Sequence, residues 1–230
     1  MYPVALAGLS FLDKLYQAFL YEDRWQLYLQ GLGRTLSITL GAILISTVLG
    51  MVLCLMKISN HRLIRWPAQI YIDVIRGIPV MVQLLLFAFV ILKWRNKVAV
   101  AIIAFGLNSA AYVAEIYRSG INAVDAGQME AGRSLGLTRW QTLWHIIFPQ
   151  AIRNCLPTYA SEFIVLVKET AVVGYIGLMD LTMAYSTIQS RTMDASAPLF
   201  IIAVVYLVIT TTLSKLFGYM ERRLRASDRR

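Results

Sequence analysis

Residues 127–136 read Gly-Gln-Met-Glu-Ala-Gly-Arg-Ser-Leu-Gly, and residues 137–150 continue as Leu-Thr-Arg-Trp-Gln-Thr-Leu-Trp-His-Ile-Ile-Phe-Pro-Gln. This stretch is the centre of a polar, charged segment that runs from about Glu115 to Pro157. The chain before and after that segment reads as apolar helix. The sequence therefore predicts two short helices that meet at a corner between membrane-embedded parts of the chain.

Local capping signals place this corner. Asp125 stands three residues before Gln128 and can cap the free N–H groups of a first helix, with Gln128 reaching back. Gly136 can end that helix, because glycine adopts the left-handed conformation without steric strain. Thr138 and Gln141 repeat the capping-box spacing, so a second helix is expected almost at once.

The second predicted helix has one apolar face, and Pro149 is expected to end it. The residues of that face recur at spacings of three and four: Trp140, Leu143, Trp144 and Ile147. Periodicity alone indicates an amphipathic helix pair that lies on the membrane surface. The order of the residues indicates a more specific role.

The order in question is Glu130-Ala131-Gly132, three residues, Gly136, nine residues, then Ile146 and Phe148-Pro149. It resembles the EAA loop of ABC-transporter permeases, whose pattern is Glu-Ala-Ala, three residues, Gly, nine residues, Ile-x-Leu-Pro. Gly132 replaces the second Ala and Phe148 replaces Leu, and both keep the small or apolar character. The resemblance implies a coupling helix that docks into a groove of a cytoplasmic ATPase subunit. The implied coupling residues are Glu130, Ala131, Gly132, Gly136 and Leu137.

The amino-acid composition indicates the environment in which this chain folds. Of 230 residues, 58% are hydrophobic and only 15% are charged, and the mean hydropathy is +0.60. These values indicate an integral membrane protein. The net charge of +9 comes from basic residues that flank apolar runs, where they set orientation and contact lipid, so no nucleic-acid partner is expected. Cys54 and Cys155 share no motif, and neither a disulfide nor a metal site is indicated.

Five apolar runs predict an all-α fold with five transmembrane helices. They are Thr35–Met56, about Gly77–Leu92 with some residues before Arg76, Val98–Ala114, about Pro157–Leu178 and Ala197–Ser214. The first has no charge and is long enough for the roughly 30 Å hydrocarbon core. Lys93–Lys97 is expected as a tight turn, and 180–194 as an external connection.

The chain is predicted to form one transmembrane permease domain over 1–230. Residues 1–33 form an external N-terminal segment, in which an apolar helical face over 11–20 predicts an interfacial helix and Asp13 argues against a cleaved signal peptide. The cytoplasmic coupling loop covers 115–157, and a basic cytoplasmic tail covers 215–230. This orientation follows from the positive-inside rule, because Lys and Arg are more numerous on the side of the loop and the tail.

Two further stretches resemble the polar amino acid branch of these permeases. Residues 76–83, Arg-Gly-Ile-Pro-Val-Met-Val-Gln, are similar to its Arg-Gly-Thr-Pro-Leu-x-x-Gln. Residues 108–118, beginning at Asn108, look like the same branch. A proline-marked helix start explains Gly77 and Pro79 equally well, and close helix packing explains most of the second stretch.

The fourth predicted span contains three ionisable residues, Glu162, Lys168 and Glu169, within 161–170. Burial of each in hydrocarbon is costly, so each should face protein or a water-filled path. The family usually has Asn-Glu-Phe-Ile here, and Ser161 replaces that Asn. The candidate substrate-path residues are Ser161, Glu162, Lys168, Glu169, Arg76 and Asn108. The competing interpretation of Glu162 is a structural ion pair with Lys168, although their separation of six residues aligns them poorly on a helix.

The resemblance, which begins near Gly31, implies the permease subunit of a type I ABC importer for polar amino acids, of the His, Gln, Glu, Arg and opine type, with basic amino acids as candidates. No Gly-x-x-x-x-Gly-Lys-Ser/Thr motif is present, so this chain is not expected to bind ATP or to be an enzyme. ATP and Mg are expected on a partner ATPase, and no cofactor on this chain. The implied partners are two ATPase subunits, a second permease chain, identical or related, an extracytoplasmic binding protein and lipid. The implied location is the bacterial cytoplasmic (inner) membrane, as a multi-pass protein.

Another class of function remains open at this point. Glu162, Lys168 and Glu169 are equally the residues that an ATP-independent carrier or channel would use as an ion relay. A membrane-embedded enzyme is a weaker alternative, because no nucleophile-base or metal constellation converges in the sequence. Transport that survives loss of ATP hydrolysis would favour the carrier.

Overall fold

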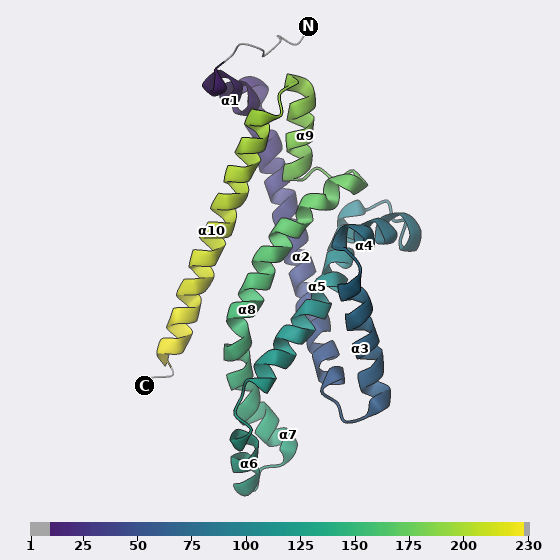
Figure 1. Cartoon of the computed structure of the whole chain (residues 1–230), viewed down its shortest axis with the longest axis vertical. Helices are drawn as coiled ribbons and strands as arrows, with labels where there is room; N and C mark the ends of the chain where they lie inside the picture. The colour runs from purple at the N-terminus through teal and green to yellow at the C-terminus, as the bar shows by residue number, and fades with distance from the viewer. Residues whose placement is uncertain (1–9, 228–230) are drawn as a thin grey trace.

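The computed structural model describes residues 10–227, with side chains through Arg223, and this part of the chain is helical with no strand. The helices are α1 (Phe11–Phe19), α2 (Trp25–Lys57), α3 (Arg62–Gly77), α4 (Val80–Leu86), α5 (Lys97–Asn122), α6 (Gly127–Ser134), α7 (Arg139–Thr142), α8 (Phe148–Glu169), α9 (Leu181–Thr192) and α10 (Ser196–Ser227). Figure 1 shows an elongated molecule in which α2, α5, α8 and α10 run along the long axis. Helices α6 and α7 protrude at one end, and α1 and α9 lie at the other.

The number of helices that could cross a membrane differs from the five predicted. By length and composition α2, α5 and α10 qualify, and α3 with α4 and the following turn forms a fourth, bent candidate. Helix α8 is not among them. It begins at Phe148, well before the expected Pro157, and ends at Glu169, where a 3₁₀ segment, Thr170–Ile176, replaces the expected continuation to Leu178. The five-span count stays a prediction.

The predicted second span is not one continuous helix. Helices α3 and α4 meet at a bend of 105°, because Ile78 is extended, as a residue before proline tends to be, and Pro79 follows. The Gln83 side-chain amide donates to the Ile75 carbonyl at 2.6 Å and to the Ile78 carbonyl at 2.8 Å. It thereby satisfies carbonyls left open where α3 ends. Gly77 and Pro79 therefore mark a break rather than the start of a span.

Pro149 does not end the helix that precedes it, contrary to the sequence prediction. Helix α7 passes through a π-helical turn, Leu143–Ile147, directly into α8. Pro149 lies in the first turn of α8. Its missing N–H is tolerated there, because the π-helical turn before it has already shifted the regular hydrogen bonds of the helix. The long helix α8 thus connects the protruding corner rigidly to the centre of the molecule.

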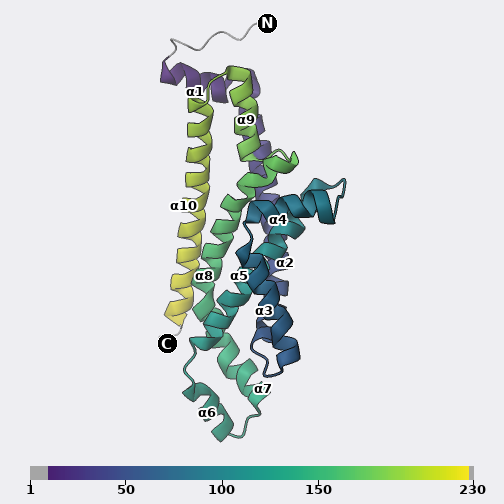
Figure 2. The ribbon, with the colours of Figure 1, turned by 45° about the vertical axis from the view of Figure 1, so that its right-hand side comes forward.

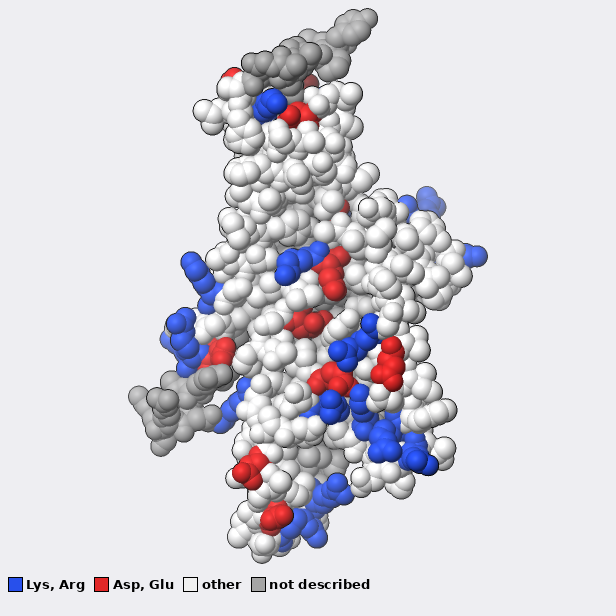
Figure 3. All heavy atoms as spheres, viewed as in Figure 1, with Lys and Arg blue, Asp and Glu red and all other residues white. Residues whose placement is uncertain are grey.

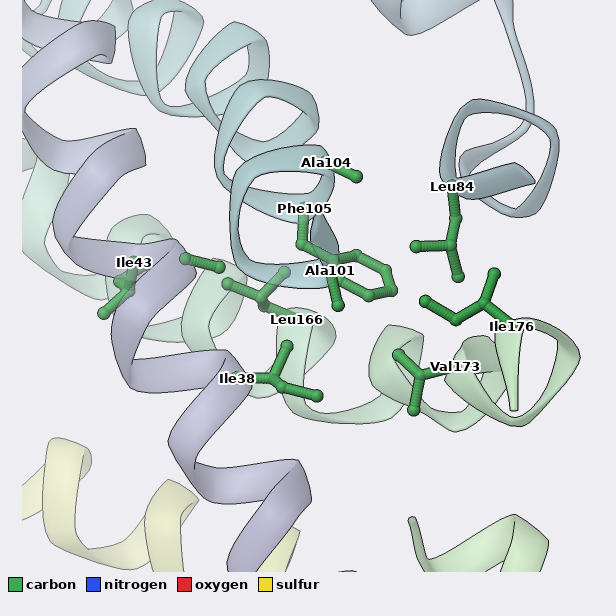
Figure 4. Close-up of a cluster of buried hydrophobic side chains, with 10 residues drawn as sticks. Ile38, Ile43, Leu84, Ala101, Ala104, Phe105, Leu166, Val173 and Ile176 are labelled. Atoms are coloured by element: carbon green, nitrogen blue, oxygen red, sulfur yellow. The ribbon is translucent and has the colours of Figure 1, made fainter. Parts of the chain in front are cut away.

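The interior is built on the contact between α2 and α5, with α4 and α8 packed around it. Figure 4 shows Phe105 of α5 among Ile38 of α2, Leu84 of α4 and Leu166 of α8, all fully buried. In a bilayer such clusters are stabilised by van der Waals contact rather than by removal from water. This packing fixes the positions of α5 and α8, which matter for the site below.

The predicted external connection over 180–194 contains a helix, α9. Asp180 caps it, because its carboxylate accepts the Met183 N–H at 2.8 Å. Leu181, Ala184 and Ile188 are fully buried in a second apolar cluster with residues of α2 and α10. This segment is therefore part of the packed structure.

Helix α1 is present where the apolar face predicted it, although residues 1–9 lie outside the described part of the chain. The Lys14 ammonium is 3.2 Å from the Asp194 carboxylate, which joins α1 to the start of α10. Partial burial opposes ionisation of Asp194. The Ala197 N–H, the Ser196 hydroxyl and Lys14 outweigh it and lower the pKa of Asp194 below its usual value.

Candidate functional site

The protruding corner between α6 and α7 is formed by the capping residues that the sequence indicated. Gly136 has a φ of +85°, its N–H donates to the Arg133 carbonyl at 3.0 Å, and the Leu137 N–H donates to the Gly132 carbonyl at 3.1 Å. This pair of bonds is the Schellman motif, which ends a helix at a left-handed glycine. The predicted role of Gly136 in the backbone is confirmed.

Of the two predicted capping boxes, the one at Thr138 is present and the one at Asp125 is not. Thr138 and Gln141 form the full capping box, with hydrogen bonds of 3.2 and 2.8 Å. Asp125 accepts the Gly127 N–H at 2.7 Å, but α6 begins only at Gly127. Gln128 does not reach back, and its amide oxygen lies 3.4 Å from the Gln150 amide instead.

The surface of this corner contains most of the candidate coupling residues. Glu130, Ala131 and Gly136 are exposed, Leu137 is half-buried, and Gly132 is buried against α7. Leu135, which the sequence reading did not single out, is 80% exposed at the tip. A leucine directly before the glycine of an otherwise polar corner was the sequence signal that could have identified it. Figure 2 shows that α6 and α7 project beyond the rest of the chain.

We expect Gly136→Val to insert normally and to lose stimulation of ATP hydrolysis by loaded binding protein. A β-branched residue at φ +85° is strained, at a cost of about 1–2 kcal/mol, and the corner would open. Gly136→Asn is the matched control, because asparagine tolerates this conformation. Stimulation in reconstituted complexes that is equal for valine and wild type would refute the docking role of the corner.

A cavity of about 500 Å³ lies between the end of α3, the C-terminal half of α5 and the middle of α8. Its ionisable lining residues are Arg76, Glu115, Arg118 and Glu162, with Tyr112 and Ser161 beside them. The space-filling view in Figure 3 shows a run of positive and negative side chains down the middle of this face. The cavity therefore presents both signs of charge to a small ligand.

Glu162 projects from α8 toward α5. Its carboxylate accepts the Ser109 hydroxyl at 2.7 Å, and Ser109 is fully buried in α5. The partner that the structure gives Glu162 is thus this neutral hydroxyl, whereas Lys168 is exposed and acts electrostatically on its neighbour Glu169. The carboxylate keeps acceptor capacity for a group in the cavity.

The charged side chains of the cavity are held by contacts between helices and, in one case, within α5. The Arg76 guanidinium lies 5.2 Å from the centre of the Tyr112 ring, a cation–π contact between α3 and α5. Glu115 is paired with Lys57 of α2 and, at 2.8 Å, with Arg118. These charges are fixed before any ligand arrives, which favours selective binding.

Of the six candidate substrate-path residues, the structure brings Arg76, Ser161 and Glu162 together at the cavity. Asn108 is buried in the packing of α5, and Lys168 and Glu169 lie farther along α8, outside the lining. Tyr112 and Arg118 were not singled out in the sequence. Tyr112, Glu115 and Arg118 follow one another at spacings of three along α5, and this spacing was the available signal.

Long apolar helices around a cavity that presents both signs of charge are typical of the membrane subunit of a transporter. The model of the family of binding-protein-dependent transport system inner membrane components matches residues 42–226, and the chain belongs to this family.

Individual relatives agree with this membership. The chain is 38% identical over 204 residues to the arginine transport system permease protein ArtQ of Bacillus subtilis (strain 168), covering 87% of this chain and 93% of ArtQ. It is 34% identical over 206 residues to the glutamate/aspartate import permease protein GltK of Escherichia coli O6:H1, covering 85% and 92%.

Solved structures give the same fold. A chain of an amino acid ABC transporter crystallised with histidines is 42% identical, with a TM-score of 0.85, covering 94% of this chain and 99% of that one. A chain of the inward-facing MetNI methionine ABC transporter is 17% identical, with a TM-score of 0.75 over 88% and 98%, and supports the fold alone. The chain has the type I ABC importer permease fold and is a permease subunit, not an enzyme. This finding favours the permease interpretation over the ATP-independent carrier.

Proposed function

We propose that this chain is the transmembrane subunit of an ATP-driven importer for polar amino acids, cationic ones among them, in the bacterial cytoplasmic membrane. The observation on which the proposal depends is the cavity that is lined by both Glu162 of α8 and Arg76 of α3. The transport of arginine named for ArtQ and the histidines named for the solved amino acid transporter support the same substrate class.

The two charges match the two ends of an amino acid. A carboxylate such as Glu162 attracts an ammonium or guanidinium group, and a guanidinium such as Arg76 binds a carboxylate through paired hydrogen bonds. Because the cavity walls have low dielectric, these interactions are stronger than in water. Every amino acid has an α-ammonium group, so a basic side chain gains a further attraction to Glu162.

The remaining parts of the importer are proposed from the corner and the charge distribution. Glu130, Ala131 and the exposed Leu135 form the surface that docks on a cytoplasmic ATPase, which binds ATP and Mg. A second permease chain completes the path, and an extracytoplasmic binding protein delivers the substrate. The loop and the tail then lie in the cytoplasm and the N-terminus outside.

We expect Glu162→Gln to lower uptake of a cationic amino acid by about tenfold more than uptake of a neutral one, which corresponds to about 1.4 kcal/mol of lost attraction. The measurement is competitive uptake in proteoliposomes that contain the complete complex and binding protein. Glu169→Gln is the control on the same helix, because Glu169 does not line the cavity. Equal loss for both substrates would reject the selectivity role of Glu162. Uptake that persists without ATP would support an ATP-independent carrier instead of an ATP-driven importer.

A further inference from the structure

Helix α3 has two different exposed faces. Its buried face includes Ala68 and Ile72, which pack in a cluster with residues of α2 and α5. One exposed face is apolar and consists of Leu63, Trp66, Ile70 and Val74, which are 45–91% exposed. The other consists of the exposed Arg65, Asp73 and Arg76 together with the half-buried Gln69, at spacings of four, four and three along the helix. We call this second face the α3 polar stripe.

The two exposed faces require different surroundings. At 100° per residue their centres lie roughly a third of a turn apart, so both cannot face the same medium. Lipid tails can cover the apolar face. Charged side chains in a membrane helix are costly unless they face water or protein, so the α3 polar stripe points away from lipid.

The upper end of the stripe is already part of the cavity. Arg76 is both the last residue of the stripe and a lining residue of the cavity that contains Glu162. From Arg76 to Arg65 the stripe descends roughly 16 Å at 1.5 Å per residue. Figure 1 shows that the start of α3 lies toward the end of the molecule where α6 and α7 protrude. The stripe therefore leads from the cavity toward the end that faces the ATPase in the proposed function.

Asp73 is the anionic residue of this stripe, between Arg76 and Arg65. It is exposed, and the Gln69 side-chain amide lies 2.8 Å from both of its carboxylate oxygens. This contact orients the carboxylate without neutralising its charge. The other carboxylate of the cavity, Glu115, is already paired with Lys57 and Arg118, so Asp73 is the carboxylate that the stripe offers to a cationic group.

We propose that the α3 polar stripe is a wall of the inner half of the translocation path, and that Asp73 is a second carboxylate that binds the cationic group of the substrate on its way to the cytoplasm. This inference rests on the proposed function and adds a residue that the sequence reading did not place in the path.

The first test is thiol accessibility in the complete complex. Cys54 and Cys155 are buried, but Cys155 is among the residues that line the cavity, so the test is made in a Cys155→Ala background whose own reaction rate is the baseline. Gln69→Cys and Asp73→Cys should react with methanethiosulfonate ethyltrimethylammonium, a charged reagent that does not cross membranes, in inside-out vesicles. Ile70→Cys and Val74→Cys are the matched controls on the apolar face, and they should react at least about tenfold more slowly. Equal rates on the two faces, or faster reaction at 70 and 74, would overturn the path assignment.

The second test separates charge from structure at Asp73. Asp73→Asn, which keeps the hydrogen bond with Gln69, should lower the maximal uptake rate of arginine by about tenfold and that of a neutral amino acid by less than twofold. Asp73→Glu should restore most of the arginine rate. Wild-type arginine uptake by Asp73→Asn would overturn the role of Asp73. A normal Glu162→Gln selectivity shift in the same assay would show that the proposed function itself survives.

Discussion

Gly132→Ala is expected to abolish binding-protein-stimulated ATP hydrolysis, although the change adds only one methyl group. An alanine Cβ at this position would lie 2.4 Å from the Thr142 methyl carbon and 2.8 Å from its hydroxyl oxygen. Thr142 is fully buried, and its hydroxyl donates to the Thr138 carbonyl at 3.0 Å. Because the Thr142 side chain is β-branched and hydrogen-bonded, it cannot rotate away from the added methyl group. Helix α6 must therefore move away from α7.

Position 132 is informative because the EAA pattern has alanine where this chain has Gly132. The close approach of α6 to α7 in this chain depends on glycine at 132 opposite threonine at 142. The consensus residue should therefore be damaging in this background. Since the corner lies apart from the buried clusters of the long helices, insertion and complex assembly should stay normal.

A double variant makes the cause testable. Thr142→Ala removes both atoms in closest conflict, so Gly132→Ala with Thr142→Ala should recover most of the stimulated ATPase rate that Gly132→Ala alone loses. Ala131→Ser is a control for a small change at the exposed neighbouring position. Non-additivity of this kind is the signature of two residues in direct contact. A single variant with wild-type stimulation, or a double variant no better than the single, would contradict the steric explanation.

The corner could be predicted in detail because its determinants are local. Helix caps and left-handed glycines act over three to five residues, and Gly136, Thr138 and Gln141 supply them within a short stretch. The break between α3 and α4 could not be decided in this way. Pro79 is compatible with a helix start or a break, and the outcome involves the Gln83 amide, which bonds back across the bend.

The site was predicted in part for a related reason. The sequence indicates which residues are unusual in a membrane helix, but not how each helix is rotated or how far along it the cavity extends. Glu162 and Glu169 share a face of an ideal helix, yet seven residues separate them by roughly 10 Å along the axis. Only Glu162 reaches the cavity, because the lining of α8 ends at Val165. Helix α9 was missed because its stability comes from packing on α2 and α10.

The approach of α9 to α2 gives the second large effect. Gly31 of α2 lies directly against the start of α9, where an alanine Cβ would be 2.6 Å from the Asp180 carbonyl carbon and oxygen and 2.7 Å from the Leu181 nitrogen. These are backbone atoms at a capped and fully buried helix start, so no side-chain rotation can relieve the overlap. Gly31→Ala must displace α9 from α2.

Gly31→Ala is expected to destabilise the purified complex by at least about 1–3 kcal/mol, the usual cost of overpacking. Gly33→Ala, two residues along the same helix, is the matched control, because in the described part of the chain nothing outside the local backbone of α2 lies within 4 Å of its added Cβ. Replacing glycine by alanine in a helix interior stabilises by about 0.5–1 kcal/mol where space permits. Thermal unfolding midpoints in detergent should therefore fall for Gly31→Ala and rise slightly for Gly33→Ala. Shifts of the same sign would mean that helix propensity, rather than the contact with α9, decides the response of α2.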